Sequence, residues 1–344
     1  MHCHLLIPDL LPRRAITAEN DPLHGVTAPA LQTLLARSRK GHGAATNMES
    51  WLCEAFGVER RQDYPIASLC ALAQGIKPEN SYWLRADPVH LAVERDQLVL
   101  EQAPVSPLSN DESDALIATL NQHFACDGLH FLAPRPEHWY LRLDEPAAIT
   151  TQTLHKALGQ SIHPLLPDGP EAMRWRALLN EIQMLLFTHP VNEARETRGE
   201  APVNSIWPWG GGILPNNVRS TFDQIWANDP LAHGLALAAG IPSQILPEGA
   251  DHWLGKASPG NHLLLLDSLR TPACYGDPHA WREQLARLEQ LWFMPLKQAV
   301  QRGSIELTLH IPATGGTSSF FTNRGSLWKL WRPVRPLTHY RPPE

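Results

Sequence analysis

The sequence of 344 residues has no apolar run near the roughly 18 residues that a membrane-spanning helix requires. A signal peptide is not expected at its start, because the basic pair Arg13 and Arg14 follows the short apolar run instead of preceding it. Positive charge is also scarce: 29 Lys and Arg stand against 35 Asp and Glu, a formal net charge of −6. These features argue against a role at a membrane and against a dedicated nucleic-acid-binding protein.

Cysteine is infrequent and unpatterned. The five cysteines are widely spaced, their number is odd and no C-x-x-C motif occurs. This excludes a zinc ribbon and a disulfide scaffold, and it predicts free thiols in a reducing cytoplasm. His2 and His4 lie on one face of an expected strand. Packed or solvated histidines are favoured there over a metal site, because no third ligand is indicated locally.

The sequence does contain enough apolar material for a large core, since 43% of its residues are hydrophobic and 19% are charged. Apolar spacing predicts alternating strands and helices. Strands are expected at 1–11, 130–132, 139–143, 205–207, 244–246, 262–267 and 304–311, and a hairpin at 82–100. Helices are expected at 29–41, 47–56, 65–75, 111–124, 173–189, 229–240 and 278–301.

The order of these elements predicts an α/β protein with a doubly wound, largely parallel sheet. Residues 1–80 and 147–344 form the α/β core in this prediction. The segment 81–146 is expected to be an inserted α+β subdomain, because it is rich in short strands between two α/β parts.

Two carboxylates follow expected strands. Asp9 comes at the end of the first strand and Asp267 at the end of HLLLLD, and α/β proteins place chemistry at this edge of the sheet. Both are therefore candidate metal ligands. For Asp9, which lies between Pro8 and Pro12, ordinary turn chemistry is the interpretation that the local sequence favours.

A second candidate site lies in the segments HPVNEAR and NSIWPWGGG, between residues 189 and 212. Three glycines after a short strand allow the backbone to approach a ligand closely, and their N–H groups can bind an anion. His189, Asn192 and Arg195 supply donors suited to a phosphate or carboxylate. A tight turn packed by the two tryptophans explains the same residues without a ligand, and local chemistry leaves both interpretations open.

The same segment resembles a signature of the archaeal-type cofactor-independent phosphoglycerate mutases, which are two-metal enzymes of the alkaline phosphatase superfamily. LLIPDLL resembles the family's first strand with its metal-binding aspartate, and YWLRADPVHL resembles the strand whose arginine, here Arg85, faces the substrate. HLLLLDSLRTPACYGD resembles the strand that carries Asp-x-x-x-His. The resemblance implies a sheet of alkaline phosphatase type, with Asp9 and Asp267 at metal positions.

Several residues that this family needs are replaced. Asp9 is followed by Leu-Leu-Pro-Arg, so the second acid of the family's first motif is missing. Thr46 and Asn47 lie in the region where the family has its nucleophilic serine. The histidine expected four residues after Asp267 is Thr271. A two-metal phosphoryl-transfer site needs several carboxylates and histidines around two cations, and too few remain.

A chain with these departures resembles the regulatory protein RpfE family, a degenerate bacterial group. The resemblance implies a non-catalytic protein with a regulatory or ligand-binding role and without a metal or other cofactor. A small phosphorylated or carboxylate ligand is expected, and no particular protein partner is indicated. The candidate ligand-binding residues are Arg85, His189, Asn192, Arg195, Asn204, Trp207, Gly210 and Gly212.

Two alternatives stay open. One is an active metal-dependent phosphoglycerate mutase or phosphatase with substituted ligands, which would use Mn, Zn or Mg. The other is a purely structural or interaction protein. Metal analysis of the purified chain separates the first alternative from the expected non-catalytic protein.

Overall fold

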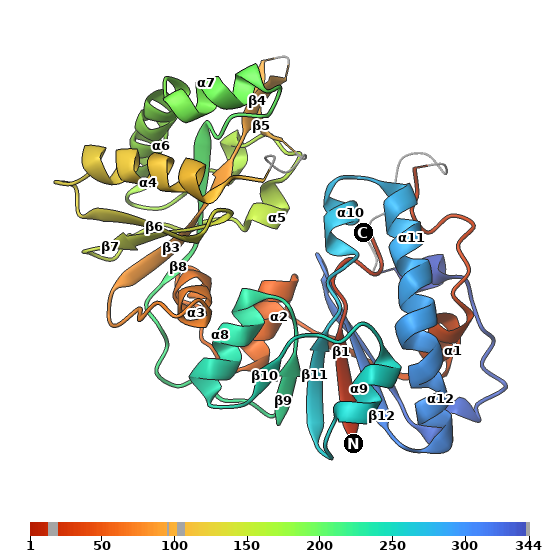
Figure 1. Cartoon of the computed structure of the whole chain (residues 1–344). Helices are drawn as coiled ribbons and strands as arrows, with labels where there is room; N and C mark the ends of the chain where they lie inside the picture. Colours follow the sequence, from red (N-terminus) through yellow and green to blue (C-terminus); the bar gives the residue numbers. More distant parts are fainter. Residues whose placement is uncertain (13–19, 95, 102–106, 342–344) are drawn as a thin grey trace. The chain divides into compact units, whose positions relative to one another are not determined.

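The computed structural model describes residues 1–12, 20–94, 96–101 and 107–341. The chain folds into two compact units (Figure 1). The core unit consists of Met1–Val58 and Asn217–Glu344, and the inserted unit consists of Glu59–Asn216. No helix within the described ranges is long and apolar enough to cross a membrane.

Among the described residues, the core unit is built on a seven-stranded sheet with the order β10-β9-β11-β1-β12-β13-β2. The strands from β10 to β12 pair in parallel, whereas β13 pairs antiparallel with β12 and with β2. The strands are β1 (His2–Leu6), β2 (Arg39–Gly43), β9 (Gln224–Trp226), β10 (Ser243–Gln244), β11 (Asn261–Leu265), β12 (Glu306–Ala313) and β13 (Gly316–Thr322). The predicted α/β architecture with a largely parallel sheet is therefore confirmed.

Helices cover both faces of this sheet (Figure 1). Cys3 and Leu5 of β1, and Ile7 directly after it, are buried against residues of α1 (Pro29–Arg37), α9 (Ala250–Lys256), α11 (Pro278–Leu288) and α12 (Met294–Arg302). The other face packs against α2 (Met48–Ala55), whose Trp51 ring lies 4.6 Å from that of His310. The remaining helices of this unit are α8 (Pro230–Ala239), which contacts α2, and the shorter α10 (Arg270–Cys274), α13 (Arg324–Leu327) and η3 (Leu337–Tyr340).

Within the described part of the inserted unit, four antiparallel strands form a sheet with the order β6-β7-β3-β8, and β4 and β5 form a separate hairpin. The strands are β3 (Tyr82–Val89), β4 (Leu91–Glu94), β5 (Gln97–Leu100), β6 (Leu129–Arg135), β7 (His138–Leu143) and β8 (Ser205–Gly212). The helices are α3 (Ile66–Ala73), α4 (Asn110–His123), α5 (Leu154–Ala157), η1 (His163–Leu165), α6 (Ala172–Phe187) and α7 (Pro190–Thr197). Apolar side chains of α4 and α6 fill a core with those of the sheet.

The inserted unit is larger than the segment 81–146 that the sequence predicts, and it contains that segment. Strand β8 belongs to it because β8 pairs with β3 in the same sheet. Helix α3 belongs to it because α3 contacts β3 and β8, and α6 adds Trp175 and Ile182 to the same apolar core.

The helix predicted to run from Pro29 to Gly41 ends at Arg37. The following residues, RKGHG, pair with β13 as the edge strand β2. Gly41 therefore lies in a strand and does not end the helix.

The helix predicted at 278–301 is interrupted by a π-helical segment, η2 (Glu289–Phe293). There the carboxylate of Glu289 accepts hydrogen bonds from the backbone N–H groups of Ala30 and Leu31, at 2.5 and 3.1 Å. These two groups are in the first turn of α1, where no intrahelical acceptor exists. The interruption thus places a buried carboxylate at the start of a helix distant in the sequence.

Candidate functional site

The structure places the residues singled out in the sequence in two separate sets. The eight candidate ligand-binding residues are all in the inserted unit, on β3, on α7 and its N-cap, and on or beside β8. Asp9, Thr46, Asn47 and Asp267 are in the core unit. Each set is described separately.

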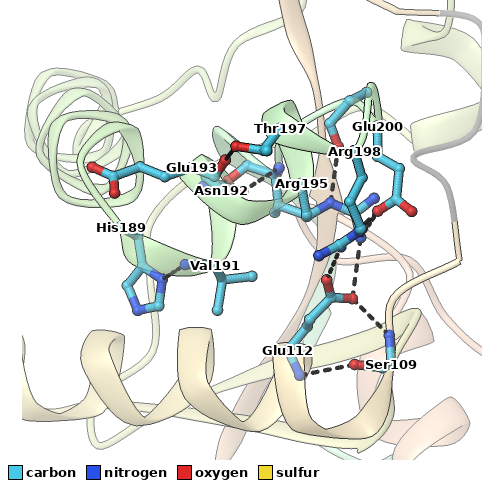
Figure 2. A network of polar contacts seen from close by, with 12 residues as sticks. Ser109, Glu112, His189, Val191, Asn192, Glu193, Arg195, Thr197, Arg198 and Glu200 are labelled. Carbon is cyan, nitrogen blue, oxygen red and sulfur yellow. Dashed lines mark hydrogen bonds and ion pairs between the residues drawn. The ribbon is translucent and has the colours of Figure 1, made fainter.

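Arg195 is fully buried and serves as the centre of an ion-pair network (Figure 2). Its Nε donates to the carbonyl of Ala201 at 3.0 Å, and its Nη1 donates to Glu112 Oε2 at 3.2 Å. Arg198 bonds Glu112 Oε1 at 2.5 Å and Glu200 Oε2 at 2.7 Å. Burial acts to raise the pKa of Glu112, but a backbone hydrogen bond from Ser109 and the two arginines outweigh it and lower the pKa. The network fastens α7 to the start of α4.

His189 and Asn192 organise the start of α7. His189 is the N-cap of this helix, and its Nδ1 accepts a hydrogen bond from Val191 N–H at 3.2 Å. Its other ring nitrogen therefore carries the proton, which is donated to Thr119 Oγ1 over 3.0 Å. The amide of Asn192 bonds the carbonyls of Leu186 and Val203, both at 2.8 Å. These polar groups of the HPVNEAR segment thus stabilise the local fold.

Asn204 and Trp207 also bond backbone groups. The amide of Asn204 pairs with both backbone groups of Leu91, accepting from its N–H at 2.8 Å and donating to its carbonyl at 2.9 Å. Trp207 donates from Nε1 to the carbonyl of Gln152 at 2.8 Å. These contacts tie the start of β8 to the hairpin and to the chain before α5.

The sequence suggests that the three glycines follow a short strand, but in the structure they lie within β8. Two residues of β8, Gly210 and Gly211, lie opposite the single residue Leu84 of β3, which is a β-bulge. Gly210 has φ +66°, and a Cβ there would lie 2.9 Å from Ile66 Cβ. A Cβ on Gly212 would lie 2.6 Å from Pro65 Cβ. Glycine is required here because the strand bulges and α3 packs directly on its backbone.

The backbone of this bulge is bonded by a hydroxyl and a carboxylate that the chain itself supplies. Gly210 N–H donates to Thr151 Oγ1 at 3.1 Å, and the Thr151 hydroxyl donates to Asp63 Oδ2. Asp63 also accepts from the backbone N–H of Thr151 at 3.0 Å and from the backbone of Gly211. Burial raises the pKa of Asp63, although these hydrogen bonds act to lower it. The backbone of Gly210 and Gly211 is thus engaged by Thr151 and Asp63 of the same chain.

Arg85 is likewise neutralised internally. It is buried, it forms an ion pair with Asp87, and it donates to the hydroxyl of Tyr140 at 3.2 Å. Its guanidinium lies 4.9 Å from the centre of the Tyr140 ring and 5.9 Å from that of Trp209. Burial acts to lower the pKa of Arg85, but Asp87 and its neighbours raise it above the ordinary value. Sequence reasoning missed Asp87, although its position two residues after Arg85 in an expected strand places both side chains on one face.

In the core unit, three neighbouring parallel strands each lead to an aspartate. Strands β9, β11 and β1 align Trp226 with Leu264, and Leu265 with Leu6. Three residues after β9 comes Asp229, two after β11 comes Asp267, and three after β1 comes Asp9. The last has φ +58°, a left-handed conformation that is uncommon outside glycine. The carboxyl edge of the sheet is therefore acidic, as the sequence predicts for two of these three residues.

A cation that the sequence analysis did not identify lies among these acids. The Arg270 guanidinium forms an ion pair with Glu49 of α2 and lies 3.4 Å from Met48 Sδ. Burial acts to lower the pKa of Arg270, but Glu49, Asp9 and Asp229 outweigh it and raise the pKa. Burial raises the pKa of Asp229 to about 6, and Arg270 acts against that increase.

Asp267 shows the same pattern. Burial raises its pKa, while a hydrogen bond from its own backbone and the charge of Arg270 act to lower it.

We name Asp9, Glu49, Asp229 and Asp267 the acidic cluster. Across the described residues, no three His, Cys, Asp or Glu side chains are arranged to hold a metal ion. The donor set does not fit the two-metal centre that the family resemblance implies, because a guanidinium lies among the carboxylates.

Thr46 and Asn47 have local structural roles. Asn47 is the N-cap of α2: its side chain accepts from Ser50 N–H at 2.8 Å, and Ser50 Oγ accepts from Asn47 N–H at 3.2 Å. Thr46 is exposed, and its N–H also donates to Ser50 Oγ at 3.2 Å. The degenerate nucleophile region is thus a capping box, which satisfies N–H groups that the first helical turn leaves without acceptors.

No protein-family model matches the chain. Its sequence is similar to a probable 2,3-bisphosphoglycerate-independent phosphoglycerate mutase of Geobacter sulfurreducens, with 27% identity over 263 residues that cover 72% of this chain and 65% of that protein. It is also 27% identical to the 2,3-bisphosphoglycerate-independent phosphoglycerate mutase of Methanosarcina acetivorans over 174 residues, covering 48% and 43%. The matched regions therefore span less than two thirds of these relatives.

The fold has a counterpart among solved structures. The PH0037 protein from Pyrococcus horikoshii matches with a TM-score of 0.55 at 14% sequence identity, covering 94% of this chain and 87% of that chain. Identity this low supports the fold alone. The sequence similarity at moderate identity relates the chain to cofactor-independent phosphoglycerate mutases, in agreement with the resemblance noted in its motifs.

Proposed function

We propose that the chain is a non-catalytic relative of the cofactor-independent phosphoglycerate mutases, of the regulatory protein RpfE type, and that its regulatory role does not use the phosphate-binding groups singled out in the sequence. One observation carries the proposal: the groups expected to hold a phosphorylated substrate are already engaged by the chain's own side chains. Arg85 pairs with Asp87, Arg195 pairs with Glu112, and the Gly210 backbone bonds Thr151 beside Asp63. A phosphorylated or carboxylate ligand would have to displace carboxylates that are already hydrogen-bonded within the fold.

The core unit supports the same proposal. Asn47 caps a helix, and a threonine hydroxyl is a weak nucleophile unless a base or metal activates it. No resident metal or other cofactor is part of the proposal. None of the five cysteines, all of which are among the described residues, forms a disulfide, and this supports a cytoplasmic location.

A coupled assay of 3-phosphoglycerate conversion, with Mn²⁺ or Mg²⁺ added, tests the absence of catalysis. The Methanosarcina acetivorans protein serves as the positive control. We expect no turnover above background, and a rate near 1 per second, which is roughly the low end for enzymes, contradicts the proposal. In parallel, millimolar 3-phosphoglycerate is expected to leave the melting temperature unchanged, because a ligand that binds only the native state would raise it.

An active metal-dependent phosphomutase or phosphatase is the second candidate, and the acidic cluster favours it. Oxygen donors of the type that Mn²⁺ and Mg²⁺ prefer are supplied by Asp9, Asp229 and Asp267 after three parallel strands and by Glu49 of α2. Hydrolysis of p-nitrophenyl phosphate with added Mn²⁺, Zn²⁺ or Mg²⁺ distinguishes this candidate. Metal-dependent hydrolysis that EDTA abolishes would support it.

A further inference from the structure

Two stretches of the core unit lack acidic residues, although the chain as a whole has a formal net charge of −6. Residues 22–48 and 307–341 contain Lys and Arg but no Asp or Glu. The fold brings the two stretches together, because β2 pairs with β13 and α1 contacts both β13 and α13. Their cations therefore gather in one part of a unit that belongs to a negatively charged chain.

A groove of about 420 Å³ lies where these two stretches meet. The exposed cations Arg39, Lys40, Arg332 and Arg335 line it, and no acid is among the described residues that do so. None of the four forms an ion pair within the described ranges of the chain. Because the groove has no counter-charge among these residues, an occupant that carries carboxylates complements it.

Contacts within the core unit hold these cations in place. Arg332 donates from Nη1 to the carbonyl of Ser38 at 2.5 Å, directly before β2. The ammonium of Lys40 lies 5.1 Å from the centre of the Tyr340 ring. The carbonyl of Arg335 accepts a hydrogen bond from a side chain of α1 at 3.1 Å. Residues 332–340 are thus fixed against α1 and β2, so an occupant meets a site that is already ordered.

Large apolar side chains are exposed in the segment that leads into the groove. They are Trp328, Leu330, Trp331 and Val334, with exposed fractions of 70, 67, 77 and 47%. Lys and Arg are interspersed with them in the sequence WKLWRPVR. Single exposed apolar residues are ordinary, but several within one short segment are typical of an interaction surface. Tryptophan and arginine are also the residues that contribute most to binding at protein interfaces.

We name residues 39–40 and 328–335 the basic aromatic surface. We propose that it binds an acidic segment of a partner protein, with apolar side chains between the carboxylates of that segment. The carboxylates enter the groove, and the apolar side chains cover the exposed tryptophans. A concave groove admits a polypeptide segment but not a flat bilayer of anionic lipid, and the net charge of −6 disfavours a long nucleic acid. This inference rests on the proposed function, because a regulatory protein without catalysis acts through a partner.

Fluorescence anisotropy with a fluorescein-labelled peptide of the repeat Glu-Asp-Leu tests the proposal on the full chain. Arg335→Glu and Trp331→Ala alter the basic aromatic surface, and both variants are expected to fold because both side chains are exposed. Arg287→Glu is the charge-matched control, since Arg287 is exposed on α11 and does not line the groove. We expect the wild type and Arg287→Glu to bind equally, and each of the other variants to bind at least about tenfold more weakly.

Three results with this peptide overturn the proposal: no binding to the wild type, equal weakening by Arg287→Glu and Arg335→Glu, or wild-type affinity in both Arg335→Glu and Trp331→Ala. Tighter binding of phosphatidylserine vesicles or of oligothymidine also overturns it, because the occupant would then be a membrane or a nucleic acid. Mutase turnover by the wild type contradicts the proposed function whatever the peptide does. An inactive wild type that does not bind the peptide contradicts only this inference.

Discussion

The indole Nε1 of Trp209 donates to Asp87 Oδ2 over 2.6 Å, while the other oxygen of the same carboxylate accepts from Arg85. Asp87 thus joins the tryptophan of the glycine-rich strand to the buried arginine of β3. The two strands pair directly at this point, with Arg85 opposite Trp209. The residues that resemble part of a substrate pocket in the sequence thus form an ion pair within β3, which is hydrogen-bonded to Trp209 of β8.

Replacing Asp87 with Asn is expected to destabilise the protein strongly. The change leaves the guanidinium of Arg85 buried without its counter-ion, and breaking a buried pair from one side costs roughly 3–5 kcal/mol. Urea unfolding followed by tryptophan fluorescence measures the free energy. Asp114→Asn on α4 is the control, because Asp114 is exposed. Equal stability of the two variants would show that the Arg85–Asp87 pair does not stabilise the fold.

Arg195→Ala and Arg198→Ala form a matched pair, because both arginines bond Glu112. Arg195 is fully buried, so its loss removes a buried donor both from Glu112 and from the carbonyl of Ala201 and is expected to cost roughly 3 kcal/mol. Arg198 has 47% of its side chain exposed, so its replacement is expected to have a much smaller effect. Thermal unfolding of both variants tests this order. If Arg195→Ala retains the wild-type melting temperature, the network of Figure 2 is not structural.

Gly210→Ala separates backbone strain from steric contact when it is compared with Gly199→Ala. Both glycines have positive φ, +66° and +74°, so each alanine is expected to cost about 1–2 kcal/mol for the left-handed backbone. A Cβ on Gly199 meets nothing within 4 Å, whereas one on Gly210 lies 2.9 Å from Ile66 Cβ. Gly210→Ala is therefore expected to be the less stable variant in chemical denaturation. Equal losses would mean that α3 moves away from β8 at no cost.

The fold could be predicted where the signals are local. The helix expected at 229–240 is α8, with Asp229 as its N-cap and Gly240 in the left-handed conformation at its end. Strands β9 and β10 have three and two residues, which are too few for apolar alternation to mark their bounds. The edge strand β2 has no apolar residue to distinguish it from a loop.

The site was less predictable because, apart from Asp87 beside Arg85, most of its acceptors are far in the sequence from the donors that the motifs identify. The motifs identify Arg195 and the glycines, but Glu112 is 83 positions from Arg195, and Asp63 is 88 positions from Thr151. Arg270 and Glu49 are 221 positions apart. A sequence pattern can indicate that a group binds an anion. Only the tertiary structure shows that the anion belongs to the same chain.

Three histidines on one face of the core sheet are also in direct contact, as the alternation of His2 and His4 along β1 suggests. The His2 and His4 rings lie 4.0 Å apart, and His4 Nδ1 lies 3.0 Å from His310 Nε2. His310 Nδ1 lies 3.0 Å from Ser319 Oγ. Since a ring–ring hydrogen bond needs one donor and one acceptor, protonation of both rings would break it. The arrangement favours the neutral form of these histidines.

The stability of the wild type is therefore expected to include a contribution from neutral His310 that decreases as the pH falls below about 6.5. Burial lowers the pKa of His310 to about 3 and that of His4 to about 4. The unfolded chain takes up these protons near pH 6.5, before the native state does, so acid favours unfolding between about pH 6.5 and 3.

His310→Gln removes the contribution of this titration to stability. Between pH 6.5 and 4.5, the unfolding free energy of the variant should therefore fall by roughly 2 kcal/mol less than that of the wild type. Other groups, Asp229 among them, titrate in the same range in both proteins, so the difference isolates His310. The exposed His279→Gln is the control and should follow the wild-type pH profile, because its ring is 82% exposed. Parallel profiles for wild type and His310→Gln would show that His310 is as readily protonated in the native state as in the unfolded chain.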